Sequence, residues 1–208
     1  MAKTTDASAA YDRARFQDAA RLAKQVAAEV PSVAAVRELA GLAAYRAGRW
    51  REAVRQLEAY GELADDVDDV PALMDCYRAL ERRKKVAELW SELRHRSPGP
   101  DVLAEARIVA AATLADSRDL EGAIALLASA GAGKALRNPS GRHVRQWYVL
   151  GDLYERAGDI PRARELFQRV YRADPEAYDV ADRLAALGGG RGRRRRTAPR
   201  GRRTERPG

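Results

Sequence analysis

The sequence predicts an all-α fold, a right-handed α-solenoid of about five helical hairpins with a C-terminal capping helix. The first observation that indicates this is a repeat, because Ala19, Ala53 and Ala87 lie 34 residues apart. Each alanine comes three residues after an expected helix entry, at Phe16, Trp50 or Lys84. A period of this length indicates stacked units that bury their apolar faces against one another. The second observation is composition, because the chain is rich in the helix-favouring residues Ala and Leu and has only two Phe.

The helix boundaries follow from the apolar periodicity and from the turn residues between segments. The expected helix pairs are 7–15 with 16–28, 32–47 with 49–63, 71–80 with 86–94, 101–116 with 120–130, and 144–157 with 160–173. A last helix at 176–187 is expected to cover the apolar face of the fifth pair, as a terminal repeat must. Together these elements define a repeat domain at 1–187, followed by a tail at 188–208.

The first two hairpins show the most regular signals in the N-terminal half. Thr5 or Asp6 is a suitable N-cap for the first helix. In the second hairpin Gly48 permits the turn between helices. Gly41 and Ala53 are small, so they allow two helices to approach closely where they cross.

The third hairpin departs from this pattern. The acidic stretch 65–69 lacks the ligand spacing of a calcium loop, so its expected role is to stabilise the N-terminal end of the following helix. A basic turn at 82–85 replaces the usual glycine. Lys84 and Ser91 stand where apolar residues are expected. This unit is therefore either a softer joint or a hairpin that packs in an altered register.

The last two hairpins preserve the repeat with added residues. Asp101 is the expected cap of the fourth hairpin, and Ala123 follows Ala87 by 36 residues. Ala163 follows Ala123 by 40 residues, and the extra length fits a loop at 131–142 that contains Gly, Asn, Pro and Ser.

The fifth unit contains the run W-x2-L-G-x2-Y-x3-G-x4-A-x3-F-x7-P. Its residues are Trp147, Leu150, Gly151, Tyr154, Gly158, Ala163, Phe167 and Pro175. This run resembles the tetratricopeptide repeat (TPR), and the resemblance extends over most of 16–187. It implies a protein-binding scaffold in which the first helix of each hairpin lines a concave groove for a partner.

Transferring that geometry by register gives the expected groove residues. They are Glu38, Leu42, Tyr45 and Arg46 in the second hairpin, and Arg145, Tyr148, Asp152 and Arg156 in the fifth. Aromatic and Arg side chains among balanced charges are typical of an interface that anchors a peptide or helix. The alternative is that Tyr45 and Tyr148 pack between neighbouring hairpins.

Other function classes have little support in the sequence. No catalytic arrangement, metal-ligand spacing or cofactor fingerprint is identifiable, so we expect a protein that is not an enzyme and has no cofactor. The single cysteine, Cys76, is expected to be a buried and unreactive thiol. No long apolar run and no signal-peptide pattern occur, which favours a cytoplasmic protein without membrane insertion.

Charge is distributed unevenly along the chain. The net charge of +8 comes from the tail, because 188–208 holds nine Arg and one Glu while the preceding 187 residues hold 29 basic and 29 acidic side chains. The tail lacks an apolar face and is expected to be disordered. Its expected anion contacts are Arg191, Arg193, Arg194, Arg195, Arg196, Arg200, Arg202 and Arg203. The alternative function is therefore a nucleic-acid- or ribonucleoprotein-associated factor tethered by this tail, with salt-sensitive and sequence-tolerant binding.

Overall fold

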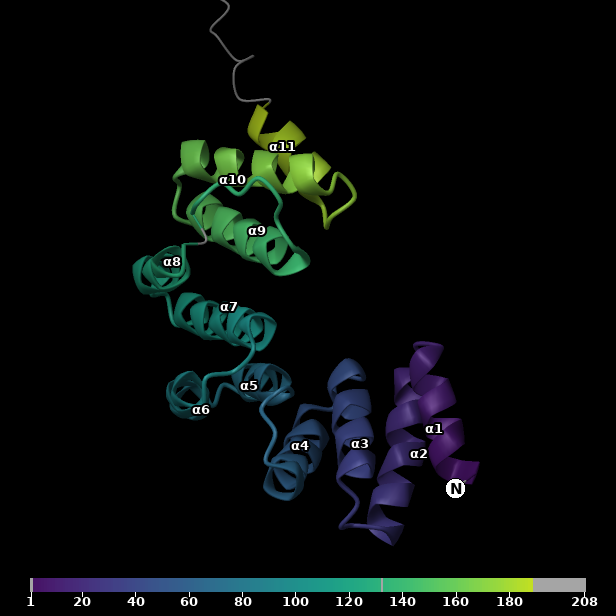
Figure 1. Ribbon diagram of the computed structural model, residues 1–208. Helices are drawn as coiled ribbons and strands as arrows, with labels where there is room; N and C mark the ends of the chain where they lie inside the picture. The colour runs from purple at the N-terminus through teal and green to yellow at the C-terminus, as the bar shows by residue number, and fades with distance from the viewer. Residues whose placement is uncertain (1, 132, 189–208) are drawn as a thin grey trace, which may run out of the picture.

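The computed structural model describes residues 2–131 and 133–188, and within these ranges the regular structure is entirely helical (Figure 1). The eleven helices of this part are α1 (Ala2–Asp12), α2 (Phe16–Glu29), α3 (Ala34–Arg46), α4 (Trp50–Ala64), α5 (Val70–Ala79), α6 (Arg83–His95), α7 (Pro100–Asp116), α8 (Leu120–Ser129), α9 (Gly141–Arg156), α10 (Ile160–Ala173) and α11 (Val180–Gly188). The all-α prediction is confirmed. The tail arginines from Arg191 to Arg203 lie outside the described residues.

The helices form five successive hairpins, α1–α2, α3–α4, α5–α6, α7–α8 and α9–α10, and α11 packs on α10 at the end. Figure 1 shows that these hairpins follow a curved path, with α3, α5, α7 and α9 on its inner side and α4, α6 and α8 on its outer side. Each hairpin packs mainly on its neighbours along the chain. The predicted helical solenoid of five hairpins with a capping helix is confirmed.

Each hairpin turn contains one residue in the left-handed region, at Ala14, Gly48, Glu81, Arg118 and Gly158. The residue five positions later is buried in every unit: Ala19, Ala53, Val86, Ala123 and Ala163. These residues occupy the point at which the two helices of a hairpin cross. Four of the five crossing residues are the predicted alanines.

The third crossing residue was predicted wrongly. Ala87 is exposed, whereas Val86 is only 2% exposed and occupies the crossing position. The reason is that the turn closes at Glu81, so α6 begins at Arg83 rather than at Lys84. The third hairpin therefore starts one residue early, and Ala87 matches the 34-residue period by coincidence.

Several helix ends also differ from the prediction. α1 begins at Ala2, so Thr5 and Asp6 lie inside the helix and do not cap it. The added turn is held to α2 by an ion pair between Lys3 and Glu29. α7 begins at Pro100, which places Asp101 in its first turn with Gly99 at the N-cap. Within the described residues, the last helix, α11, ends close to the prediction but starts at Val180 instead of 176.

Two glycines allow the closest helix contacts. A Cβ atom on Gly151 would lie 2.8 Å from Cε1 of Phe167, and one on Gly41 would lie 2.6 Å from Cδ2 of Leu57. Phe167 is fully buried, so its ring has little room to move. The glycines therefore fix the distance between α3 and α4 and between α9 and α10.

Candidate functional site

The inner helices are joined by a series of polar contacts that begins on α3. The Tyr45 hydroxyl donates to Asp75 Oδ2 on α5 at 3.1 Å. On the same helix Arg78 donates from Nε to Asp75 Oδ1 at 2.8 Å, and its Nη1 reaches Asp116 Oδ2 on α7, also at 2.8 Å. Three successive inner helices are thus linked side chain to side chain.

The series continues to the C-terminal end of the solenoid. Arg145 on α9 lies 2.7 Å from Glu105 on α7, measured from Nε to Oε1, and Arg142 donates to Asp101 at 3.0 Å. On α11, Arg183 donates from Nη1 to Asp152 at 2.9 Å and to Glu155 at 2.8 Å. Every inner helix from α3 to α9 is therefore tied to the next, and α9 is tied to α11.

Tyr148 lies under the capping segment. Its ring stacks on Tyr178 with 4.2 Å between centroids, and its hydroxyl donates to Asp179. The Arg183 guanidinium lies 5.7 Å from the Tyr148 ring centroid. Burial, followed by the hydrogen bond to Asp179, raises the pKa of Tyr148 to about 12. Tyr148 consequently keeps its proton and acts as a hydrogen-bond donor.

Tyr45 has a similar environment in the second hairpin. Burial and the neighbouring Asp75 carboxylate raise its pKa to about 12, and its ring lies 5.9 Å from that of Trp50. Leu42 is half-buried against the core, and Glu38 is half-buried on the same helix. Arg46 is exposed and places its guanidinium 4.5 Å above the Phe16 ring. Both tyrosines therefore contact an adjacent unit, as in the alternative interpretation of the sequence.

The structure divides the predicted groove residues into two groups. Tyr45, Tyr148 and Asp152 have partners on another helix or the capping segment, so part of their surface is already used. Arg46, Arg145 and Arg156 are all exposed, although Arg145 also pairs with Glu105 on α7. Among the described residues, Arg156 has only a long ion pair to Asp152 on its own helix, at 3.7 Å. The accessible members of the predicted set are thus mainly arginines.

Sequence reasoning did not single out Asp75, Arg78 or Arg183. A usable signal was present, because the paired groups are separated by roughly one repeat. Tyr45 and Asp75 are 30 residues apart, and Asp152 and Arg183 are 31 residues apart. A search for complementary polar residues at this spacing would have found them.

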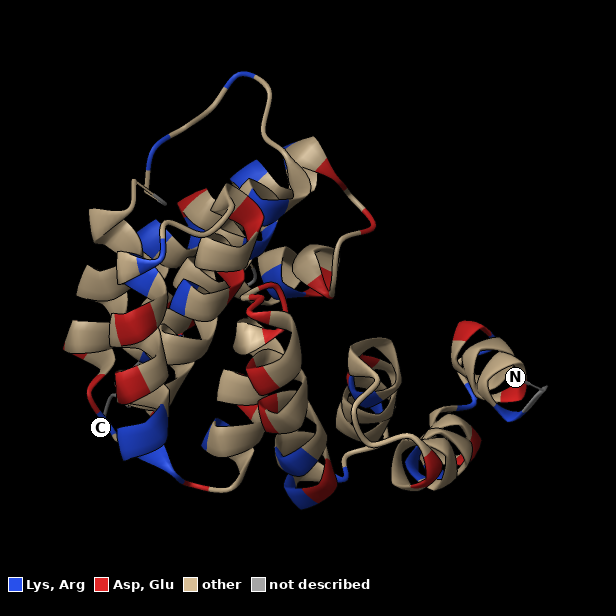
Figure 2. Cartoon of the chain, turned by 60° about the horizontal axis from the view of Figure 1, so that its bottom comes forward, with Lys and Arg blue, Asp and Glu red and all other residues tan. Residues whose placement is uncertain are grey.

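Acidic and basic residues are interspersed along the helices (Figure 2). Within residues 2–131 and 133–188, no group of three or more His, Cys, Asp or Glu side chains is placed to hold a metal ion. Cys76 is fully buried, and burial raises the pKa of its thiol to about 12, so it is present as the unreactive thiol at neutral pH. No helix in the described ranges is long and apolar enough to cross a membrane.

Comparisons with known proteins agree with this architecture. Two family models described as tetratricopeptide repeat match residues 5–66 and 144–187. Among solved structures, the chain is similar to TTC0263, a thermophilic TPR protein of Thermus thermophilus, with a TM-score of 0.68 and 16% sequence identity over 89% of this chain and 96% of that one. At this identity the likeness concerns the fold. The comparison with curated protein sequences found no match.

Proposed function

We propose, from the premise that this chain belongs to the tetratricopeptide repeat family, that it is a non-catalytic scaffold whose inner face binds a partner protein. TPR units support protein interaction in general, and we assign the partner's binding site to the inner face of this solenoid. The observation that carries it is the continuous series of side-chain contacts from Tyr45 to Arg183 along the inner helices. A surface whose helices are already fixed to one another loses less conformational entropy when a partner binds.

The proposed contact residues are the exposed arginines of this face, Arg46, Arg145 and Arg156, together with the accessible edges of Tyr45 and Tyr148. Arginine and tyrosine are enriched among residues that dominate binding energy at interfaces. Because arginine binds carboxylates through two parallel hydrogen bonds, the expected partner offers Asp or Glu side chains to this face.

The test uses affinity purification of the full chain with quantitative mass spectrometry. The variant Arg46→Glu/Arg156→Glu should lose defined partners that the unmodified protein retains. A matched control, Arg21→Glu/Arg164→Glu, makes the same charge change at exposed residues of α2 and α10. Equal loss in both variants, with helicity unchanged by circular dichroism, would reject a specific inner-face site.

A second candidate function rests on the separation of charge along the chain. The nine Arg that follow residue 187 are opposed by one Glu, whereas the preceding residues are electrically balanced. We propose that removal of 189–208 abolishes salt-sensitive retention on a nucleic-acid column, because such binding arises from counterion release. Retention that persists after this removal would assign the binding to the repeat domain and contradict the proposal.

A further inference from the structure

A groove lies on the outer side of the solenoid, between α4 and α6 and above α5. It consists of two adjoining hollows of about 470 and 390 Å³. One is lined by the C-terminal halves of α4 and α6, and the other by their N-terminal ends. Leu57 in the first hollow is one turn from Val54 in the second, and Leu73 is one turn from Tyr77. The two hollows therefore follow one another along α4, and the hydrogen bond from the Tyr77 hydroxyl to Glu58 joins their linings.

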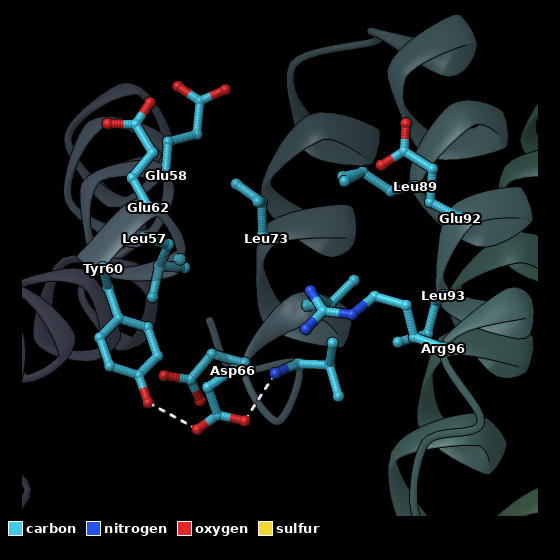
Figure 3. A pocket seen from close by; sticks show the side chains of 14 residues that line it. Leu57, Glu58, Tyr60, Glu62, Asp66, Leu73, Leu89, Glu92, Leu93 and Arg96 are labelled. Carbon is cyan, nitrogen blue, oxygen red and sulfur yellow. Dashed lines mark hydrogen bonds between the residues drawn. The ribbon is translucent and has the colours of Figure 1, made fainter. Parts of the chain in front are cut away.

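The floor of the larger hollow is apolar. Leu57 on α4, Leu73 on α5 and Leu93 on α6 line it, together with the less buried Leu89 (Figure 3). These side chains come from three helices and point into the same space. Leu57, Leu73 and Leu93 are at most 8% exposed, so the apolar surface open to another protein segment comes mainly from the half-buried Leu89, Val67 and Val70.

The walls of this hollow are acidic. Figure 3 shows Glu58 and Glu62 on the α4 wall and Glu92 on the α6 wall, with the leucines between them. Five carboxylates line the hollow in all, against one arginine, Arg96. Arg96 is itself bound to Asp65, with 2.7 Å between Nη2 and Oδ1.

Two of these carboxylates, Glu62 and Glu92, differ from those of the inner face, whereas Glu58 accepts from the Tyr77 hydroxyl and Asp66 from the Tyr60 hydroxyl. On the inner face Asp75, Asp116 and Asp152 each pair with an arginine. Among the described residues, Glu62 and Glu92 have neither an ion-pair nor a hydrogen-bond partner. Their charge is therefore available to a cationic ligand that also covers the apolar floor.

The other end of the groove has the opposite charge. Arg51, Arg82 and Lys85 surround Val54 and Leu80 there. The groove thus has an acidic end and a basic end over a shared apolar floor. This polarity would orient a bound segment, because the wrong direction places like charges together.

We propose that the α4–α6 groove binds an amphipathic helix of a partner protein, with its apolar face over Leu89, Val67 and Val70 and its Lys or Arg side chains beside Glu62 and Glu92. A helix lying in an apolar groove is a recurrent mode of peptide recognition. α4 has 15 residues, so the groove accommodates a helix of about 14 residues. This site is separate from the inner-face site.

The tail of this chain is a poor occupant of the groove. It supplies nine arginines but has no Leu, Ile, Val, Met or aromatic residue from 189 to 208. It can pair with the carboxylates but cannot cover the apolar floor. The proposed ligand needs both properties on one helix face.

The test uses the full chain and a fluorescent peptide of about 14 residues in which Leu forms one helical stripe. Lys stands beside the stripe in the half meant for the acidic hollow, and the other half is Ala and Leu only. Fluorescence anisotropy in about 50 mM salt keeps electrostatic screening low. The variant Glu62→Lys/Glu92→Lys should weaken binding at least about tenfold. A peptide with Glu in place of Lys should bind this variant more tightly than it binds the unmodified protein.

A matched control separates local contacts from total charge. Glu121→Lys/Glu176→Lys changes the net charge equally at two exposed glutamates that lie outside the groove, and it should leave the affinity within about twofold. Equal weakening in both double variants would overturn the proposal, as would equal competition by a peptide of residues 189–208. The inner-face variant Arg46→Glu/Arg156→Glu should bind the Lys peptide normally, so failure of one site is distinguishable from failure of the other.

Discussion

Asp69, at the N-terminal end of α5, is a half-buried carboxylate in an unfavourable position. Its Oδ2 atom is inaccessible to solvent and accepts no hydrogen bond from any described residue. Burial, together with the nearby carboxylates of Glu38, Asp66 and Asp68, raises the pKa of Asp69 to about 6. We predict that Asp69→Asn stabilises the protein at pH 8 and has little effect at pH 4.

Asp69 lowers stability at high pH because its carboxyl group keeps its proton to a higher pH in the folded state than in the unfolded state. The pKa of Asp69 is raised on folding from its ordinary value of 3.8, so stability falls as the pH rises from about 4 to about 6 and is then constant. The full shift corresponds to at most about 3 kcal/mol. Loss of a negative charge at the helix N-terminus offsets roughly 0.3–1 kcal/mol of this. After a further allowance for partial exposure, the expected gain at pH 8 is about 1–2 kcal/mol.

Neighbouring groups do not cancel this effect. The pKa of Asp66 is lowered, first by its hydrogen bond from the Tyr60 hydroxyl and then by the Asp68 amide, so Asp66 stays ionised between pH 5 and pH 8. The remaining nearby charges are Glu38 on α3, Asp68 in the same loop and Arg96, the C-cap of α6. We expect the Asn variant to leave these groups in place, because it changes a single side chain of nearly the same size.

The measurement is urea unfolding followed by circular dichroism at several pH values from 4 to 8. Because a solenoid can open unit by unit, hydrogen exchange of α5 amides gives the local free energy as well. Asp68→Asn removes the same charge from an exposed residue of the same loop and is the control. A gain that is equal at pH 4 and pH 8, or equal in the control, would refute the role assigned to burial of Asp69.

Three further substitutions test the packing. Gly151→Ala should destabilise the fifth hairpin by about 1–3 kcal/mol in thermal or urea unfolding, because the new methyl group overlaps the Phe167 ring. Val86→Ala should lower the free energy of unfolding by about 2 kcal/mol, whereas Ala87→Glu should change it by less than about 0.5 kcal/mol. The reverse order would show that the register of the third hairpin is assigned wrongly. Arg183→Ala should speed hydrogen exchange in α11, with a local loss of about 1–2 kcal/mol and little change in α1–α4.

The sequence predicts the fold well where local chemistry determines it. Gly48 and Gly158 have the positive φ angles that the turns require, and the crossing alanines beside them are fully buried. The family match at 5–66 contains the second hairpin, and the match at 144–187 covers the fifth hairpin except for the first turn of α9. In the third hairpin the left-handed residue is Glu81, which gives no such signal, and the spacing of alanines alone indicated the wrong residue.

The candidate site could be predicted only in part, because side-chain pairing depends on how successive helices lie against one another. The register places Tyr148 correctly on an inner helix. It cannot show that the segment 174–179 turns back so that Tyr178 covers the Tyr148 ring and Arg183 reaches Asp152. These contacts depend on the direction of the chain after α10, which no periodic pattern encodes.

The irregular third hairpin is where the proposed outer groove lies, and the two features have a common cause. A shift of one residue rotates the exposed face of a helix by about 100°. In α6 this shift turns Ala87 outward and leaves Leu89 half-buried at the groove. By contrast, the residues that carry the repeat signature in the fifth unit, among them Trp147, Leu150 and Phe167, are buried in the core, where they cannot contact a partner. Specificity for a partner is therefore expected to come from the unit that departs most from the repeat.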